Sequence, residues 1–371
     1  MKPEYTAYAI TLIGVMGVSA ITPGLPEIAR TFSISSAEVS MLITFFTLPG
    51  VFFSPLTGLI ADKVGRKPVA STAIFVFGIS GFLCPFYDFR TMLFLRFIQG
   101  ISASSLVALS TTIIGDTYTG IEREKLIGYN ASILTVGIAF YQLAGGFLAH
   151  INWRYPFYIF LLAIPVGLFV LLSPVKDVKS EKLVKLKINR KLIFLFFLGF
   201  TAYSLLYGTF LAYIPFVVYS LGGTSITVGL VQATMSISTA FFAANLVRIS
   251  KRLKKFVIPV GFLSYAISLI AVLVSMLTKC EQFLIACSLM FGYAQGTVLP
   301  TLQHSVVSLT ESKGRATIMS IYGSVSKLGQ TFGPAFFGLF PLEVIYIVGT
   351  LLAISVSAIS KQVLKLKSNL T

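Results

Sequence analysis

The sequence predicts an all-α membrane protein in which twelve transmembrane helices form two six-helix bundles. Of its 371 residues, 56% are hydrophobic and only 11% are charged, and the mean hydropathy is +0.87. Soluble domains carry about twice that share of charged residues. Apolar runs long enough to cross a membrane recur along almost the whole chain, and weak matches between its halves indicate an internal duplication.

The apolar runs follow one another with short polar connections. They fall near residues 5–28, 37–61, 68–86, 91–115, 126–149, 153–172, 192–219, 226–247, 256–277, 282–307, 316–340 and 344–360. A transmembrane β-barrel would show alternating segments of about 10 residues, so these longer runs predict helices. The first run has the length of a signal peptide, but no A-x-A-like site precedes Pro23. It is therefore interpreted as the first helix.

Basic residues are concentrated at one side of the predicted bundle. Most of the 29 lysines and arginines fall at the two termini and in every second connection. The positive-inside rule then predicts a multi-pass protein of the plasma membrane with both termini in the cytoplasm. The net charge of +16 favours a basic cytoplasmic face near anionic membrane lipid, and no nucleic-acid partner is expected.

Short matches at similar offsets relate the two halves. Gln99 and Gly100 recur as Gln295 and Gly296, and the other matches follow in the same order. The predicted domains are an N-terminal bundle at 1–172, a basic cytoplasmic linker at 173–191 and a C-terminal bundle at 192–371. The linker alternates basic and apolar residues, which suits either a helix on the membrane surface or a flexible connection.

Residues 58–70, "GLIADKVGRKPVA", resemble the signature between the second and third helices of the major facilitator superfamily. The stretch 16–26 resembles the first-helix motif of its drug:proton antiporter branch. "LFLRFIQGISASS" resembles the fourth-helix motif of that branch, and the stretch from Gly314 its eleventh helix. The resemblance implies the twelve-helix, two-domain fold and alternating access.

Helix-packing residues are expected within these motifs. They are Pro23, Pro26, Gly145, Gly146, Gly333 and Pro334. Small residues let neighbouring helices approach closely in a membrane. The fifth helix departs from the branch, because Tyr141 and Gln142 stand where Gly-Pro is found. Since that motif is tied to export in the branch, an importer or uniporter of a neutral or anionic solute stays open as an alternative.

The charged connection after the second helix is predicted to act as a conformational latch. Its residues are Gly58, Asp62, Gly65, Arg66 and Lys67. If the halves pack as in the family, Asp62 faces the start of the eleventh helix, where the helix dipole favours a carboxylate. The two glycines would permit close approach and a tight turn. Alternatively, the basic residues only signal topology.

Ionisable groups at membrane depth are expensive and are read as functional by default. Arg96 and Lys327 are the basic residues inside predicted spans, and no acidic residue is expected near mid-membrane. These two cations therefore predict an electropositive pocket that favours anionic or neutral amphipathic substrates. Lys327 is a candidate proton carrier. The alternatives are helix cross-linking for Arg96, through carbonyls or Gln99, and snorkelling for Lys327.

The predicted substrate cavity combines these cations with polar and aromatic residues near mid-depth. Its residues are Arg96, Gln99, Tyr203, Tyr207, Gln232, Gln295, Lys327 and Gln330. Tyr203 and Tyr207 are expected on one helix face, at i and i+4. Tyrosine and glutamine also cross-link helices, so simple structural roles remain the alternative.

The predicted function is secondary active transport: proton-coupled efflux of small amphipathic organic compounds, drug-like or sugar-like. The expected partners are a small-molecule substrate, protons and lipid, and the family makes a monomer the expected state. The sequence has no G-x-x-x-x-G-K-[ST] loop for ATP and no H-E-x-x-H pair for zinc. No catalytic residue, cofactor or metal is therefore predicted, and the protein is not expected to be an enzyme.

Overall fold

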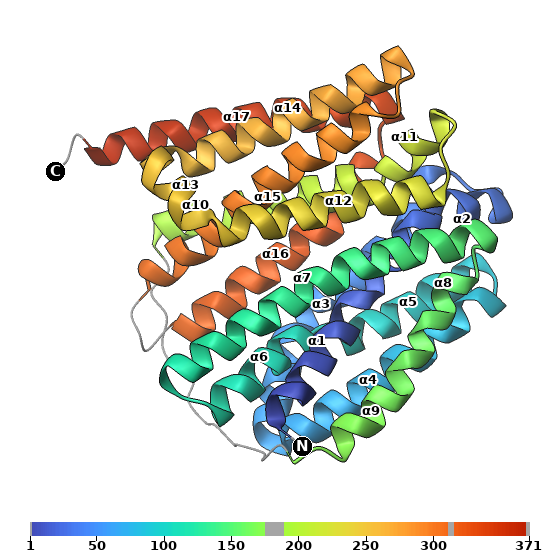
Figure 1. Ribbon diagram of the computed structural model, residues 1–371, viewed down its shortest axis with the longest axis vertical. Helices are drawn as coiled ribbons and strands as arrows, with labels where there is room; N and C mark the ends of the chain where they lie inside the picture. The colour runs from blue at the N-terminus through green and yellow to red at the C-terminus, as the bar shows by residue number, and fades with distance from the viewer. Residues whose placement is uncertain (1, 175–188, 311–314, 369–371) are drawn as a thin grey trace. The chain divides into compact units, whose positions relative to one another are not determined.

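The computed structural model describes residues 2–174, 189–310 and 315–368, and every regular element in these ranges is a helix. The chain divides into two compact units, Met1–Val184 and Lys185–Thr371. Within the first unit α4 and α9 run side by side, and within the second α14 and α17 do so (Figure 1). The all-helical prediction is confirmed.

The N-terminal unit holds the first half of the helices. They are α1 (Pro3–Ser19), η1 (Thr22–Gly24), α2 (Leu25–Phe32), α3 (Ser36–Val64), α4 (Arg66–Leu83), η2 (Cys84–Phe86), α5 (Phe89–Ala103), α6 (Leu106–Thr117), α7 (Gly120–Ile151), α8 (Tyr155–Tyr158), η3 (Ile159–Leu162) and α9 (Ala163–Leu171).

The C-terminal unit holds the second half. Its elements are α10 (Arg190–Leu205), the π-helical turn η4 (Leu206–Leu211), α11 (Ile214–Ser220), α12 (Ser225–Ala244), α13 (Leu246–Leu253), η5 (Lys254–Phe256), α14 (Val257–Thr278), α15 (Phe283–Ser308), α16 (Arg315–Phe337) and α17 (Leu342–Ser368).

Within the described residues, ten helical segments are long and apolar enough to span a membrane. The two remaining predicted spans are helical as well. Tyr155–Leu171 is apolar but shorter, and α16 has 23 residues with Lys327 and Gln330 along it. The eleventh span is thus set apart by its polarity and not by its length.

Polar residues mark where several helices begin. Ser35 and Glu38 form a capping box at α3, in which the Glu38 N–H donates to Ser35 Oγ over 3.1 Å and the Ser35 N–H donates to Glu38 Oε2 over 2.8 Å. Asp88 caps α5, and Asn189 Oδ1 accepts from the Leu192 N–H at the start of α10 over 2.9 Å. These caps satisfy backbone N–H groups that have no partner within the helix.

Glycines set the closest helix contacts. A Cβ on Gly145 of α7 would lie 2.0 Å from the Ala20 carbonyl oxygen, just beyond α1. A Cβ on Gly333 of α16 would lie 2.5 Å from the Ser204 carbonyl oxygen of α10. Gly146, Pro23, Pro26 and Pro334 are buried as well. Any larger residue at Gly145 or Gly333 would push two helices apart.

Most of the predicted linker, at 175–188, lies outside the described residues. The interfacial helix and the predicted domain boundaries at 172 and 192 therefore stay predictions. Among the residues that are described, no group of three or more His, Cys, Asp or Glu side chains could hold a metal ion.

Candidate functional site

Arg96 lies in α5, and its side chain is completely buried in the N-terminal unit. Its Nη2 donates to the Gly17 carbonyl over 2.8 Å, its Nε donates to the Leu42 carbonyl over 3.2 Å, and its Nη1 donates to Gln99 Oε1. The guanidinium carbon lies 4.2 Å from the centre of the Phe46 ring. The charge is therefore matched by carbonyl dipoles and an aromatic face.

Gln99 extends this network, because its Nε2 donates to the Phe77 carbonyl over 3.1 Å. Together Arg96 and Gln99 connect α1, α3, α4 and α5. Neither side chain has exposed surface, so this pair does not line an open cavity in the structure, contrary to the sequence expectation. The contacts are those of the alternative, in which Arg96 cross-links helices.

A second polar network in the N-terminal unit was missed at the sequence level. Thr11 Oγ1 of α1 lies 2.7 Å from both Ser110 Oγ of α6 and Asn130 Oδ1 of α7. Asn130 Nδ2 donates to Ser110 Oγ over 3.1 Å. All three side chains are buried. Single Thr, Ser and Asn residues are too common in the sequence to signal such a contact.

Two predicted cavity residues of the C-terminal unit are also buried links. Gln232 of α12 donates to the Leu211 carbonyl over 3.4 Å, at the end of the π-helical turn. Gln295 of α15 accepts from the Tyr265 hydroxyl of α14, whose ring centre lies 4.8 Å from that of Phe291. Gln232 is completely buried and Gln295 nearly so. Buried amides need partners, and here neighbouring helices supply them.

Tyr203 and Tyr207 are half-buried. The expected i, i+4 relation assumed a continuous α-helix, but η4 begins at Leu206, so the π-helical turn changes the angle between the two side chains. Such π-helical turns frequently occur at functional sites.

The seam between α10 and α16 is tightly packed. A Cβ on Gly329 would lie 2.4 Å from the Phe200 carbonyl oxygen, and Ser204 Oγ donates to the Gly329 carbonyl over 3.2 Å. The Tyr213 hydroxyl donates to the Pro334 carbonyl over 3.0 Å. This seam fixes the rotation of α16 about its own axis.

Lys327 lies on a different face of α16 from that seam. It is two residues before Gly329, a rotation of about 200° around an α-helix. Lys327 and Gln330 are both half-buried. Within the described part of the chain neither side chain has a hydrogen bond or an ion pair. They differ in this from the buried cavity candidates, whose side chains are hydrogen-bonded: Arg96, Gln99, Gln232 and Gln295.

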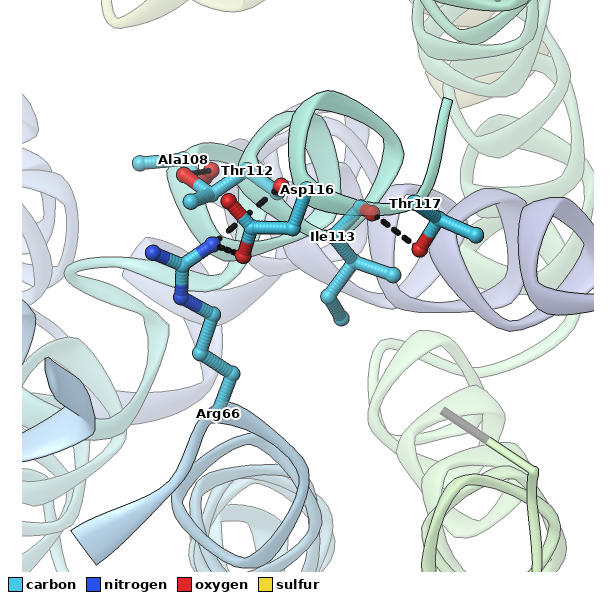
Figure 2. Close-up of polar contacts among 6 residues, drawn as sticks. All are labelled: Arg66, Ala108, Thr112, Ile113, Asp116 and Thr117. Atoms are coloured by element: carbon cyan, nitrogen blue, oxygen red, sulfur yellow. Dashed lines mark hydrogen bonds and ion pairs between the residues drawn. The ribbon is translucent and has the colours of Figure 1, made fainter. Parts of the chain in front are cut away.

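The charged connection between α3 and α4 makes contacts inside the N-terminal unit. The Arg66 guanidinium forms an ion pair with Asp116 near the end of α6 and donates to the Thr112 carbonyl over 3.3 Å (Figure 2). Lys67 Nζ donates to the Ser173 carbonyl over 3.2 Å. Asp116 was not predicted as a partner, because nothing in the sequence brings the end of α6 beside the start of α4.

Two glycines of the predicted latch differ. Gly65 has φ 115°, a left-handed conformation that favours glycine, so the tight turn is present. A Cβ on Gly58 would meet no described atom within 4 Å, so the close approach expected there is not seen. Asp62 lies in the last turn of α3, and its side chain is outside the described residues. Its role as a latch stays a prediction.

Near the same end of the N-terminal unit, the Tyr118 hydroxyl donates to a carboxylate oxygen of Glu4. Tyr118 lies in the connection between α6 and α7, and Glu4 is buried in the first turn of α1. Burial and the Glu4 carboxylate raise the pKa of Tyr118 to about 12. The phenol therefore stays protonated and links α1 to this connection.

The sequence of this chain is similar to a known protein family and to proteins of known name. The family model described as Major Facilitator Superfamily matches residues 7–334. The Quinolone resistance protein NorA of Staphylococcus aureus (strain MSSA476) is 26% identical over 228 residues, which cover 57% of this chain and 59% of that protein. The Bacillibactin exporter of Bacillus subtilis (strain 168) is 25% identical over 363 residues, covering 91% and 89%.

Solved structures agree on the fold. A variant of the nucleoside transporter NupG has a TM-score of 0.83 at 12% identity, covering 97% of this chain and 99% of that one. A D-xylose-proton symporter has a TM-score of 0.80 at 16% identity, covering 96% of each. The chain spans less than two thirds of the NorA relatives that it matches. Given the family match, the chain belongs to the Major Facilitator Superfamily of multi-pass membrane transporters, which are not enzymes.

Proposed function

We propose that the chain is a secondary active transporter that exports small amphipathic organic compounds by alternating access, in exchange for protons. Export is supported by the two relatives, one named for quinolone resistance and the other for bacillibactin export. Proton exchange is supported by the motifs that resemble the drug:proton antiporter branch. Drug-like and sugar-like compounds are the proposed substrates.

The observation that carries a transport role is the polar face of α16. Lys327 sits well inside a helix of 23 residues, where a charged group facing lipid is costly. The same helix packs against α10 through its glycines on another face. A half-buried ammonium in this position needs water or a polar ligand, which a solute pathway provides.

The site residues fall into groups with different proposed roles. Tyr203, Tyr207, Lys327 and Gln330 are proposed to contact substrate. The buried network around Arg96 holds the helices of the N-terminal unit in place.

Asp62, Gly65, Arg66 and Lys67 are proposed to act as a conformational latch at the end of α3. The end of the unit that bears Arg66 is proposed to face the cytoplasm, with both termini on that side of the plasma membrane, and the transporter is proposed to act as a monomer.

Reconstitution tests the proposal. The purified chain is placed in liposomes with an imposed pH gradient, and internal pH is recorded while anionic, neutral and cationic amphiphiles are added. Exchange predicts proton movement that starts with a substrate and stops with a protonophore. Protein-free liposomes control for passive leak.

Substrate movement at a rate that does not depend on the pH gradient would favour the alternative, an importer or uniporter of a neutral or anionic solute. One observation keeps this alternative open. Tyr141 and Gln142 are buried in α7, at the positions where the antiporter branch carries Gly-Pro. No substrate movement with any amphiphile class would contradict the proposed function.

A further inference from the structure

Arg96 and Lys327 are cationic side chains deep within helices of the two units, and their surroundings differ completely. Every contact described above for Arg96 is made to its own bundle: two backbone carbonyls, the Gln99 amide and the Phe46 ring. Lys327 has no hydrogen bond or ion pair within the described residues. The first cation is therefore a structural link, whereas the second keeps three N–H donors available.

Lys327 lies too far from either end of α16 for its ammonium group to reach the membrane surface. It stands 12 residues after Arg315 and 10 before Phe337, so the helix ends are about 15 Å or more away along the axis. A lysine side chain cannot span that distance by snorkelling. The ammonium therefore stays at depth.

Neighbouring positions on α16 supply further polar groups. Gln330 and Ser324 each lie about 60° around the helix from Lys327, one turn on either side. Both are half-buried. Gln330 offers a side-chain N–H₂ as donor, and Ser324 a hydroxyl. This face gathers donors around one positive charge, and the glycines that pack on α10 lie elsewhere on the helix.

We propose that Lys327, with Gln330 beside it, binds the carboxylate of the transported compound, and that the substrates are amphipathic organic anions. The proposal rests on the transport function proposed above and names its substrate class. A carboxylate accepts several charge-assisted hydrogen bonds at once, which matches an ammonium with an adjacent amide. The ligand supplies the counter-charge that Lys327 lacks among the described residues.

The role assigned to Lys327 is that of a permanent counter-ion and not of a proton carrier. A counter-ion has to remain charged while substrate is bound, whereas a carrier has to lose its proton in each cycle. Arginine keeps the charge and does not deprotonate in proteins. Lys327→Arg should keep anion recognition, and Lys327→Met should abolish it.

Binding is measured on the purified full chain in detergent by equilibrium dialysis. The probes share one aromatic scaffold: naphthylacetate, naphthylacetamide and naphthylethylamine. The wild-type chain should bind the carboxylate about tenfold more tightly than the amide, as expected for one charge-assisted contact. The amine should bind more weakly than the amide, because it meets a like charge.

The variants give the decisive comparison. Lys327→Met should equalise the carboxylate and the amide, Lys327→Arg should retain the preference, and Gln330→Leu should reduce it. Lys251→Met, which removes an exposed lysine of α13, is the matched control for net charge and should leave the preference unchanged.

The proposal is overturned if the wild-type chain binds the amide or amine at least as well as the carboxylate. It is also overturned if Lys327→Met keeps the preference. Binding needs no gradient, so this test is independent of the transport test. Anion preference without proton-coupled export would contradict only the proposed function. Proton-coupled export that is unchanged in Lys327→Met would contradict only this inference.

Discussion

Individual polar residues of this membrane protein differ in whether their hydrogen-bonding capacity is used. Arg96, Gln99, Gln232 and Gln295 all looked like cavity residues, and all four are bonded to groups on other helices. Removing a partner from such a network leaves buried carbonyls or amides unsatisfied, at about 1–3 kcal/mol each. Removal of an unpaired cation should instead leave the free energy of unfolding unchanged or raise it, because the cost of desolvating the charge is removed.

Stability should therefore respond in opposite directions to the loss of the two cations. Arg96→Leu should destabilise the protein by about 3 kcal/mol, because the carbonyls of Gly17 and Leu42 lose their donor. Lys327→Met should leave stability unchanged or raise it. Thermal unfolding in detergent can be followed with a thiol-reactive dye, since Cys84 and Cys287 are buried free thiols. Equal destabilisation by both substitutions would contradict the assignment.

The Tyr118 link makes a prediction about pH. Because the folded state raises the pKa of Tyr118 to about 12, its contribution is complete below the usual tyrosine value of about 10. It is lost only as pH rises through the higher value. Tyr118→Phe should lower the melting temperature by the same amount at about pH 7 and about pH 9. A difference that disappears at the higher pH would show that the phenol ionises earlier.

At the scale of helices, packing distances separate glycines that look alike in the sequence. Gly145 and Gly58 both lie inside long helices, and both belong to stretches that were compared above with family motifs. Gly145 has a neighbouring backbone, with its Cβ position 2.0 Å from the Ala20 carbonyl oxygen, whereas no described atom lies within 4 Å of the Cβ position of Gly58. The π-helical turn η4 is a second feature at this scale. Its wider turn changes the angle between the side chains of Tyr203 and Tyr207.

The two glycines provide a matched pair of substitutions. Gly145→Val should cost several kcal/mol, because overpacking displaces α7 from the end of α1. Gly58→Ala should be neutral or stabilising by about 0.5–1 kcal/mol, since alanine favours the helix. Melting temperatures of the two variants beside wild type check this. A severe effect of Gly58→Ala would indicate a contact of α3 that the described residues do not include.

At the scale of the whole molecule, the charge of the substrate determines how transport couples to the membrane potential. Export of a carboxylate in exchange for a proton moves one more elementary charge per cycle than export of its amide. Each charge is worth about 2.3 kcal/mol per 100 mV, or a concentration ratio of roughly fiftyfold. An anion exporter should therefore respond to potential more steeply than the same protein carrying a neutral compound.

Proteoliposomes with valinomycin and a potassium gradient test this coupling. The rate of naphthylacetate movement should rise more steeply with the imposed potential than that of naphthylacetamide. Parallel responses of the two probes would mean that the carboxylate crosses as the neutral acid. Liposomes that contain no protein correct for passive permeation of each probe.

The sequence by itself determined the membrane class, the helical architecture and the unusual position of Lys327. These properties are local, because hydropathy and helix length depend on residues within one span. It also identified Gly145, Gly333 and the turn at Gly65 through motifs with a clear steric reason. The pairing of the Tyr118 phenol with Glu4 had no such local signal.

Only the tertiary structure decided which polar groups are satisfied. The partners of Arg96 lie 54 and 79 residues away along the chain, and Asp116 meets Arg66 across 50 residues. Such pairs depend on the rotation and register of packed helices, which hydropathy does not encode. For the same reason the structure was needed to distinguish Lys327, which has no ion pair among the described residues, from Arg96, whose charge is fully bonded within its bundle.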